Sequence, residues 1–158
     1  MGDGRSVFNL GILTISDAGA KGERADTSGD AINEIMSGLG FRLALRDIVP
    51  DEPDQISERL SDWCDGGEVD VVLTTGGTGL GPRDVTPEAC HSIIDKEVPG
   101  LAEAMRADTR QFTSMAMLSR SVAGVRSGCL IINLPGSPTG VQETLDVVVP
   151  VIPHALEM

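Results

Sequence analysis

The sequence predicts an α/β domain in which a mainly parallel β-sheet is flanked by helices. Short apolar runs rich in β-branched residues alternate with amphipathic stretches at helical spacing, which is the pattern of such a domain. Aromatic residues make up only 3% of the chain, so Val, Ile, Leu, Ala and Met must form the core, as in buried parallel strands. The 158 residues contain no repeat, low-complexity tract or linker, and we therefore expect one domain over residues 1–158.

In the first half of the chain we expect two strands, each followed by a helix. The first strand covers residues 7–15 and is followed by a loop, after which Ser28 can cap a helix. The second strand covers residues 41–49, and the next helix starts near Pro53 and ends at the glycine pair of residues 66–67.

The second half continues the alternation of strands and helices. We expect strands over residues 69–73 and 129–134, and helices from Thr86 towards Val98, over residues 101–112, and from Thr139 or Gly140 onward. The pattern over residues 113–128 is compatible with either a loop or a strand.

The charge of the chain limits the ligands that it can bind. The formal net charge is -12 at pH 7, which argues against a nucleic-acid partner because duplex binding depends on neutralising phosphates with Lys and Arg. A small phosphate ester remains possible where backbone N–H groups or a metal ion supply local positive potential. Any phosphate site should therefore be rich in glycine.

The cysteines and the N-terminal segment indicate a cytoplasmic protein. The three cysteines, Cys64, Cys90 and Cys129, give no complete disulfide framework and are too far apart in sequence for a compact zinc cluster. Residues 1–16 lack the pattern of an export signal, and no apolar run reaches membrane-spanning length. We expect no membrane partner.

Polar motifs follow the predicted strands at the edge where ligands gather in open α/β sheets, because helix N-termini with partial positive charge meet there. Four motifs are expected on this one rim: Ser16 and Asp17 after the first strand, Asp51 after the second, Gly76, Gly77, Thr78 and Gly79 after the third, and Pro135, Gly136 and Ser137 after a later one.

The glycine-rich loop and two aspartates are the strongest candidates for chemistry. Glycine accepts positive φ and leaves N–H groups unshielded, although the loop matches neither the Rossmann fingerprint nor the P-loop and is also compatible with a simple tight turn. Asp51 and Asp84 follow different strands, so both can point into one cleft and share Mg²⁺. The alternative is that one flanks a helix and the other closes a turn.

Histidine offers little to this rim, since His91 and His154 both lie outside its motifs. Acid–base chemistry based on histidine is therefore disfavoured. Phosphoryl or nucleotidyl transfer asks less of a protein base when the nucleophile is an ionised phosphate oxygen, because positioning and charge neutralisation can suffice. Arg83 lies inside the glycine-rich loop and is the best-placed cation for a phosphate, followed by Arg120; Ser119 is a candidate hydroxyl donor.

Seven ordered motifs covering nearly the whole chain resemble the MogA/MoaB family of molybdopterin-binding proteins, whose domains also occur in gephyrin. They are LTISD at 13–17, DTSG at 26–29, TTGGTG at 74–79, PRDVTPE at 82–88, LSR at 118–120, AGV at 123–125 and LPGSP at 134–138.

This resemblance implies a three-layer molybdopterin-binding fold, commonly trimeric, that transfers AMP from Mg-ATP to the terminal phosphate of molybdopterin and releases pyrophosphate. A homotrimer and a protein partner for molybdenum insertion are the expected assemblies. Asp51 and Asp84 match the family's acidic catalytic positions, with Mg²⁺ as their metal. The substrate-binding positions implied are Ser16, Asp17, Gly76, Gly77, Thr78, Gly79, Arg83, Ser119, Pro135, Gly136 and Ser137.

Within this family, the sequences PRDVTPE and PGSP favour the adenylyltransferase branch over the MoaB-like branch. A non-catalytic molybdopterin carrier or scaffold remains the main alternative. A general nucleotide-binding module that uses the glycine-rich loop for another phosphate compound is the third possibility.

Overall fold

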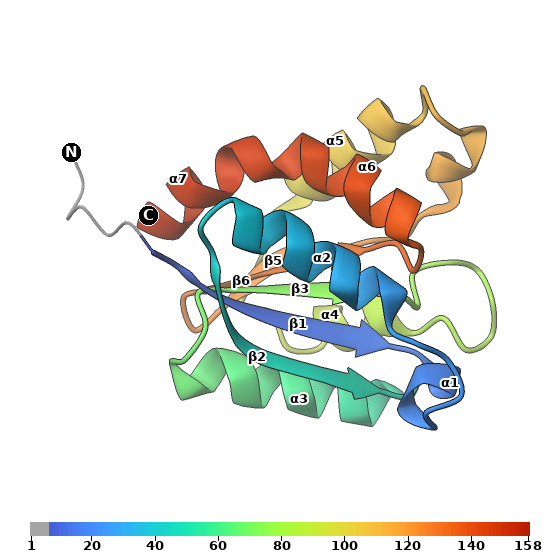
Figure 1. The fold of residues 1–158 in the computed structure, drawn as a ribbon, viewed down its shortest axis with the longest axis horizontal. Helices are drawn as coiled ribbons and strands as arrows, with labels where there is room; N and C mark the ends of the chain where they lie inside the picture. Colours follow the sequence, from blue (N-terminus) through green and yellow to red (C-terminus); the bar gives the residue numbers. More distant parts are fainter. Residues whose placement is uncertain (1–6) are drawn as a thin grey trace.

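The computed structural model describes residues 7–158, which form a six-stranded sheet between two layers of helices (Figure 1). The strands are β1 (Asn9–Ile15), β2 (Arg42–Val49), β3 (Val71–Thr75), β4 (Lys96–Glu97), β5 (Ala123–Arg126) and β6 (Cys129–Leu134). The helices are α1 (Asp17–Ala20), α2 (Thr27–Gly38), α3 (Pro53–Gly66), α4 (Thr86–His91), α5 (Pro99–Thr109), α6 (Pro138–Val148) and α7 (Ile152–Glu157), with 3₁₀ turns η1 (Ser114–Leu118) and η2 (Val149–Val151). The first part of the N-terminal segment, read above as lacking an export signal, lies outside the described residues.

The sheet is mixed and mostly parallel, as predicted. Its strand order is β2-β1-β3-β6-β5-β4, and the first four strands run parallel to one another. β5 and β4 continue it in antiparallel pairing. A two-residue turn joins β5 to β6, with φ of 50° at Ser127 and 78° at Gly128, as expected for a tight hairpin.

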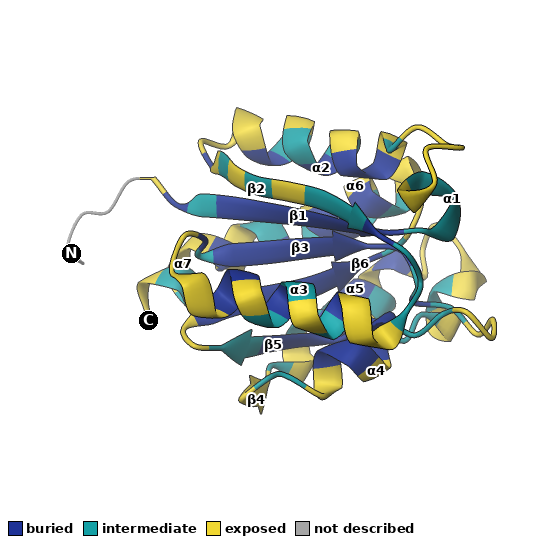
Figure 2. Ribbon diagram, turned by 90° about the horizontal axis from the view of Figure 1, so that it is seen from below, coloured by how far each residue is buried: buried dark blue, intermediate teal, exposed yellow. Residues whose placement is uncertain are grey.

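A separate apolar core lies on each face of the sheet, which makes the domain three layers thick. Helices α2, α5, α6 and α7 cover one face, where they pack against inward side chains such as Leu10 and Ile12. Helices α3 and α4 cover the other face, which includes Leu13 and Ile15. Figure 2 shows the central strands buried along most of their length, which explains their near-continuous apolar sequence.

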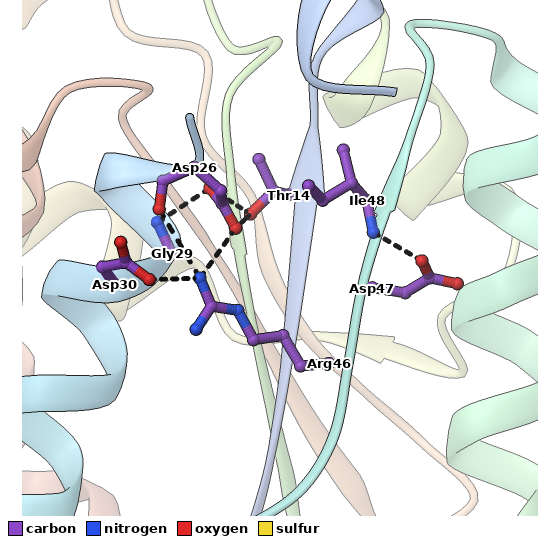
Figure 3. Close-up of polar contacts among 7 residues, drawn as sticks. All are labelled: Thr14, Asp26, Gly29, Asp30, Arg46, Asp47 and Ile48. Atoms are coloured by element: carbon purple, nitrogen blue, oxygen red, sulfur yellow. Dashed lines mark hydrogen bonds and ion pairs between the residues drawn. The ribbon is translucent and has the colours of Figure 1, made fainter. Parts of the chain in front are cut away.

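Helix α2 begins earlier than its predicted cap. Ser28 lies within the helix and is buried, and Asp26 is the cap, since its carboxylate accepts a hydrogen bond from Gly29 N at 3.0 Å. The same carboxylate accepts hydrogen bonds of 2.9 Å from the Thr14 hydroxyl of β1 and 3.0 Å from Arg46 of β2 (Figure 3). The start of α2 is therefore fixed by contacts with two strands, and not only by its local sequence.

The prediction of a helix from Thr86 towards Val98 was wrong beyond His91. Helix α4 ends at His91, and the chain then turns to form β4. Asp95 N donates to Val125 O at 2.8 Å and Val98 N to Ala123 O at 2.8 Å, so residues 95–98 lie along β5. Pairing with a distant strand has overridden the helical spacing. No helix within residues 7–158 has both the length and the hydropathy needed to cross a membrane.

A buried asparagine connects the parallel part of the sheet to the segment entering β5. The Asn133 side chain accepts from Val122 N at 3.1 Å and donates to Thr74 Oγ1 at 3.0 Å. Asn133 is fully buried, so no water can replace these bonds at its amide.

We therefore predict that Asn133→Ala lowers the free energy of unfolding by roughly 1–3 kcal/mol, because it leaves Val122 N–H buried without its acceptor. Urea unfolding of both proteins at equilibrium measures this loss. A loss below about 0.5 kcal/mol, the range of an ordinary surface substitution, would contradict the prediction.

Candidate functional site

The carboxyl ends of β1, β2, β3 and β6 meet at one edge of the sheet, and the predicted motifs follow these ends. Backbone hydrogen bonds hold the turns together there: Ser16 N donates to Val49 O at 2.9 Å, and Gly76 N to Leu134 O at 3.2 Å. The structure thus brings the four motifs to a common rim, as the sequence predicted.

Two cavities open at this rim. The smaller, of about 250 Å³, is here called the carboxylate pocket; the predicted site residues that line it are Ser16, Gly76, Gly77, Gly136, Asp51 and Asp84. The larger, of about 520 Å³, is here called the apolar pocket; the predicted site residues that line it are Thr78, Gly79, Ser119, Pro135 and Ser137. Both aspartates therefore lie on the same side of the molecule, whereas Asp17 and Arg83 line neither cavity.

A pair of glycines with positive φ shapes the turn after β3. φ is 102° at Gly76 and 71° at Gly77, values that side chains rarely allow. A Cβ at Gly76 would overlap the Ile15 carbonyl oxygen, and one at Gly77 would overlap Thr86 Oγ1. Thr86 in turn donates from Oγ1 to Gly76 O at 2.9 Å and from its backbone N to Gly77 O at 3.1 Å. The first turn of α4 therefore fits only against a glycine backbone.

Arg120 supports the glycine-rich loop. Its backbone N donates to Thr78 O at 2.9 Å, and its guanidinium donates to Gly79 O and Asp84 O, both at 2.8 Å. The same guanidinium forms an ion pair with Glu88. Arg120 is thus occupied in fixing the loop that carries Asp84, a role that the sequence motif alone did not reveal.

Asp51 and Asp17 are joined by reciprocal hydrogen bonds. Asp17 N donates to Asp51 Oδ2 at 2.9 Å, and Asp51 N donates to Asp17 Oδ1 at 3.0 Å. Arg83 then donates to Asp17 from Nε at 3.1 Å and from Nη2 at 2.9 Å, and to Glu52 at 3.0 Å. Arg83 therefore contacts carboxylates rather than facing either pocket.

The surroundings of the two joined aspartates shift their pKa values in opposite directions. Burial raises the pKa of Asp51, and the negative charges of Asp17 and Asp84 raise it further, against the lowering effects of the Asp17 N–H bond and the Arg83 charge. Hydrogen bonds from Arg83 and then from Asp51 N lower the pKa of Asp17. Asp51 is the carboxylate whose negative charge this site opposes.

Asp26, Asp51 and Asp84 line the carboxylate pocket, and Asp26 is already bound by Thr14 and Arg46. The other two carboxylates suit a magnesium ion that also binds phosphates. Asp84 Oδ2 accepts from Gly81 N at 2.9 Å, and Asp51 uses Oδ2 for Asp17 N. Each carboxylate keeps one oxygen to which no hydrogen bond is assigned within residues 7–158. No group of three or more His, Cys, Asp or Glu side chains in that range could hold a metal. This fits Mg²⁺, which takes one or two carboxylates together with substrate phosphates and water.

The apolar pocket has a different chemistry. Met105, Phe112 and Met115 are among its apolar lining residues, and Arg106 and Glu143 are its charged residues. Arg106 is held by hydrogen bonds to Ser119 O at 3.3 Å and Ser121 O at 3.1 Å. No sequence motif predicted these residues, because they come from α5, the segment after it and α6, and meet only in the folded chain. Such a cavity suits a flat heteroaromatic ring.

Two serines predicted as substrate-binding positions also cap helices. Ser16 Oγ accepts from Gly19 N and Ser137 Oγ accepts from Gly140 N, both at 3.0 Å. Their hydroxyl hydrogens can still donate to a ligand. Ser119 Oγ donates instead to Ser121 Oγ at 3.1 Å.

The fold and the rim together define an α/β protein with two pockets at the carboxyl ends of its parallel strands. The family described as "Probable molybdopterin binding domain" matches residues 11–154. The chain belongs to this family, the MogA/MoaB family of molybdenum cofactor biosynthesis.

Similar proteins carry names from both branches of the family. A molybdopterin adenylyltransferase of Helicobacter pylori is 42% identical over 154 residues, which cover 96% of this chain and 88% of that protein. The crystal structure of a molybdopterin biosynthesis enzyme MoaB from Thermus thermophilus matches with a TM-score of 0.89 and 55% identity over 94% of each chain. A tungsten cofactor synthesizing protein MoaB from Pyrococcus furiosus matches with a TM-score of 0.87 and 36% identity over 96% of each chain.

We predict that Gly77→Ala lowers the free energy of unfolding by roughly 1–3 kcal/mol, because it strains a positive-φ position and its Cβ overlaps Thr86 Oγ1. Gly66→Ala is the matched control, since its Cβ would contact nothing within 4 Å on a helix and should be neutral or stabilising. Equilibrium unfolding of the three proteins tests this. Equal stability of the Gly77 and Gly66 variants would show that the turn does not require glycine.

Asp51→Asn should stabilise the fold at neutral pH. A raised pKa in the folded state means that the stabilisation from protonated Asp51 is complete below the ordinary aspartate pKa of about 3.9 and is lost as the pH rises through the folded value. Removing the charge should therefore raise the urea midpoint at about pH 7, and the difference should shrink near about pH 3. A wild-type protein more stable than the variant at neutral pH would contradict this.

Proposed function

We propose that this protein transfers AMP from Mg-ATP to the terminal phosphate of molybdopterin, with release of pyrophosphate. Membership of a molybdenum cofactor biosynthesis family supports this proposal. The observation that carries the proposal is the arrangement of Asp51 and Asp84 in one polar pocket, beside a glycine turn and next to an apolar pocket. A metal-bound triphosphate and a flat ring system are the ligands that this pair of cavities would suit.

In the proposed reaction, a terminal phosphate oxygen of molybdopterin attacks the α-phosphorus of ATP. A new P–O bond forms as the bond to the β-phosphate oxygen breaks, and pyrophosphate leaves with that electron pair. The nucleophile is already ionised at neutral pH, so the absence of a histidine from the two pockets is no obstacle. The protein's task is to align the two phosphates and offset their repulsion.

The residues of the rim divide this task. Gly76 and Gly77 let phosphate oxygens approach the backbone, and Ser16 at the edge of the carboxylate pocket can donate its hydroxyl hydrogen. Asp51 and Asp84 would hold Mg²⁺, which when bound supplies the positive charge that draws the phosphates together. Without such a cation, the two carboxylates would repel a triphosphate.

The alternative is a molybdopterin carrier or scaffold of the MoaB-like type. It is supported by the similarity to proteins named MoaB, whose fold this chain shares closely. Both hypotheses predict pterin binding. Only the adenylyltransferase hypothesis predicts that AMP derived from ATP becomes attached to the pterin.

Under the proposed function, Asp51→Ala and Asp84→Ala should each lower the rate of AMP transfer at least about a hundredfold, because each removes a charge-stabilising group from the reacting phosphates. A single-turnover assay with ATP labelled at the α-phosphate, Mg²⁺ and molybdopterin measures the adenylylated pterin directly.

Arg126→Gln is the matched control, since it removes an exposed ion pair with Asp65 at the opposite edge of the sheet and should leave the rate unchanged. Retained activity in both aspartate variants would rule out the assigned roles. Pterin binding by wild-type protein without AMP transfer would favour the carrier.

The expected assembly and location follow from the same proposal. We propose a homotrimer in the cytoplasm that passes its adenylylated product to a molybdenum-insertion protein. Light scattering coupled to size-exclusion chromatography measures the oligomeric state of the purified chain.

A further inference from the structure

We propose that Asp17 and Arg83 are positioning residues that act through Asp51, and that neither is a ligand of the substrate phosphates. This inference rests on the proposed function for the reaction in which Asp51 takes part. The sequence analysis had placed both residues among the substrate-binding positions, Asp17 because it lies in the LTISD motif and Arg83 because it lies inside the glycine-rich loop.

Asp17 fixes Asp51 at both its side chain and its backbone. The Asp17 N–H holds Asp51 Oδ2 at 2.9 Å, which directs the other carboxylate oxygen away from this bond. Asp17 Oδ1 accepts from Asp51 N at 3.0 Å, so the ends of β1 and β2 are tied together at the residue that lines the pocket. Rotation of either side chain breaks one of these two hydrogen bonds.

Arg83 keeps the Asp17 carboxylate in that arrangement. Asp17 and Asp51 carry like charges in contact with one another, and Asp84 adds a third negative charge nearby. Two hydrogen bonds from Arg83 offset this repulsion at Asp17, and a third to Glu52 attaches the guanidinium to the residue next to Asp51. Without Arg83, the Asp17 side chain would gain by turning towards solvent.

The placement of Arg83 argues against direct contact with phosphate. Neither Asp17 nor Arg83 lines the carboxylate pocket, and Nε and Nη2 of Arg83 are directed at Asp17 and Glu52. A phosphate could reach Nε or Nη2 only by displacing carboxylates, and the remaining nitrogen, Nη1, belongs to a side chain that lines neither pocket.

The exposure of this cluster gives it a distinctive experimental signature. The Arg83 side chain is 54% exposed and that of Asp17 is 36% exposed, so their ion pair should contribute little to overall stability. A small displacement of a reacting or charge-stabilising group can nevertheless cost two orders of magnitude in rate. Loss of Arg83 should therefore affect turnover and not thermal stability.

The test compares Arg83→Gln, Arg83→Lys and Asp17→Ala with the wild-type chain, and Arg126→Gln, which breaks an ion pair far from the pockets, is the control for the rate. We expect Arg83→Gln and Asp17→Ala to lower kcat for AMP transfer about 10- to 100-fold, with KM for ATP changed less than about twofold. The melting temperature of Arg83→Gln should match that of the wild-type chain, and Arg83→Lys should recover part of the rate. The Asp17→Ala, Arg83→Gln double variant should be little worse than the poorer single variant, because both act on one group.

A second readout does not depend on catalysis. In a crystal structure of Arg83→Gln, the Asp17 carboxylate should have left its hydrogen bond with Asp51 N, and the Asp51 carboxylate should have moved as a result. A raised KM for ATP with unchanged kcat would overturn the proposal and make Arg83 a direct phosphate ligand. Unchanged kinetics, or an Asp51 carboxylate that stays in place, would also overturn it. If the wild-type chain transfers no AMP, the proposed function fails, and the crystal structure of the variant alone decides the positioning role.

Discussion

The backbone turn at Gly76 and Gly77 is the constraint on which the rest of the site depends. Two successive positive φ values turn the chain sharply at the end of β3, so that Thr86 can bond back to the turn. Arg120, which lies shortly before β5, donates hydrogen bonds to the loop between β3 and α4. Asp84 in that loop lines the same pocket as Asp51. Side chains at the two glycines would overlap their neighbours and open this arrangement. The absence of side chains at these two glycines therefore shapes the pocket as much as the carboxylates that line it.

The site places the negative charge of Asp51 where the protein alone does not favour it. Burial and two neighbouring carboxylates raise the pKa of Asp51. Acidic residues outnumber basic ones in the chain, so its net charge does not offset this repulsion. Arg83 offsets part of this repulsion at Asp17, outside the pocket, while the pocket itself retains its negative carboxylates. Such a site is stabilised by a bound cation, and a phosphate ligand that arrives with Mg²⁺ supplies it. The two apolar cores, one on each face of the sheet, stabilise the fold and offset this local electrostatic destabilisation.

The sequence was sufficient to predict the α/β class, the mainly parallel sheet and the convergence of the motifs, because strand periodicity and glycine-rich turns are local signals. It was insufficient where long-range pairing decides the outcome. Residues 95–98 pair with β5, so α4 ends at His91, and contacts from β1 and β2 make Asp26 the cap of α2. The hydrogen-bond partners of Arg83 and the apolar lining around Phe112 could not be predicted from the sequence either, because these contacts join segments far apart in the chain. The motifs predicted which residues lie at the rim. Only the structure distinguishes the residues that line a pocket from those that hold the lining residues in place.

The central claim is that Asp51 and Asp84 jointly bind the metal of a metal-bound nucleotide. A crystal structure of the protein with Mn²⁺, as a magnesium substitute visible by anomalous scattering, and a non-hydrolysable ATP analogue tests this most directly. The account predicts one anomalous peak in the carboxylate pocket, within coordination distance of one oxygen from each aspartate and of a phosphate oxygen. A nucleotide bound with its metal away from both carboxylates would contradict it.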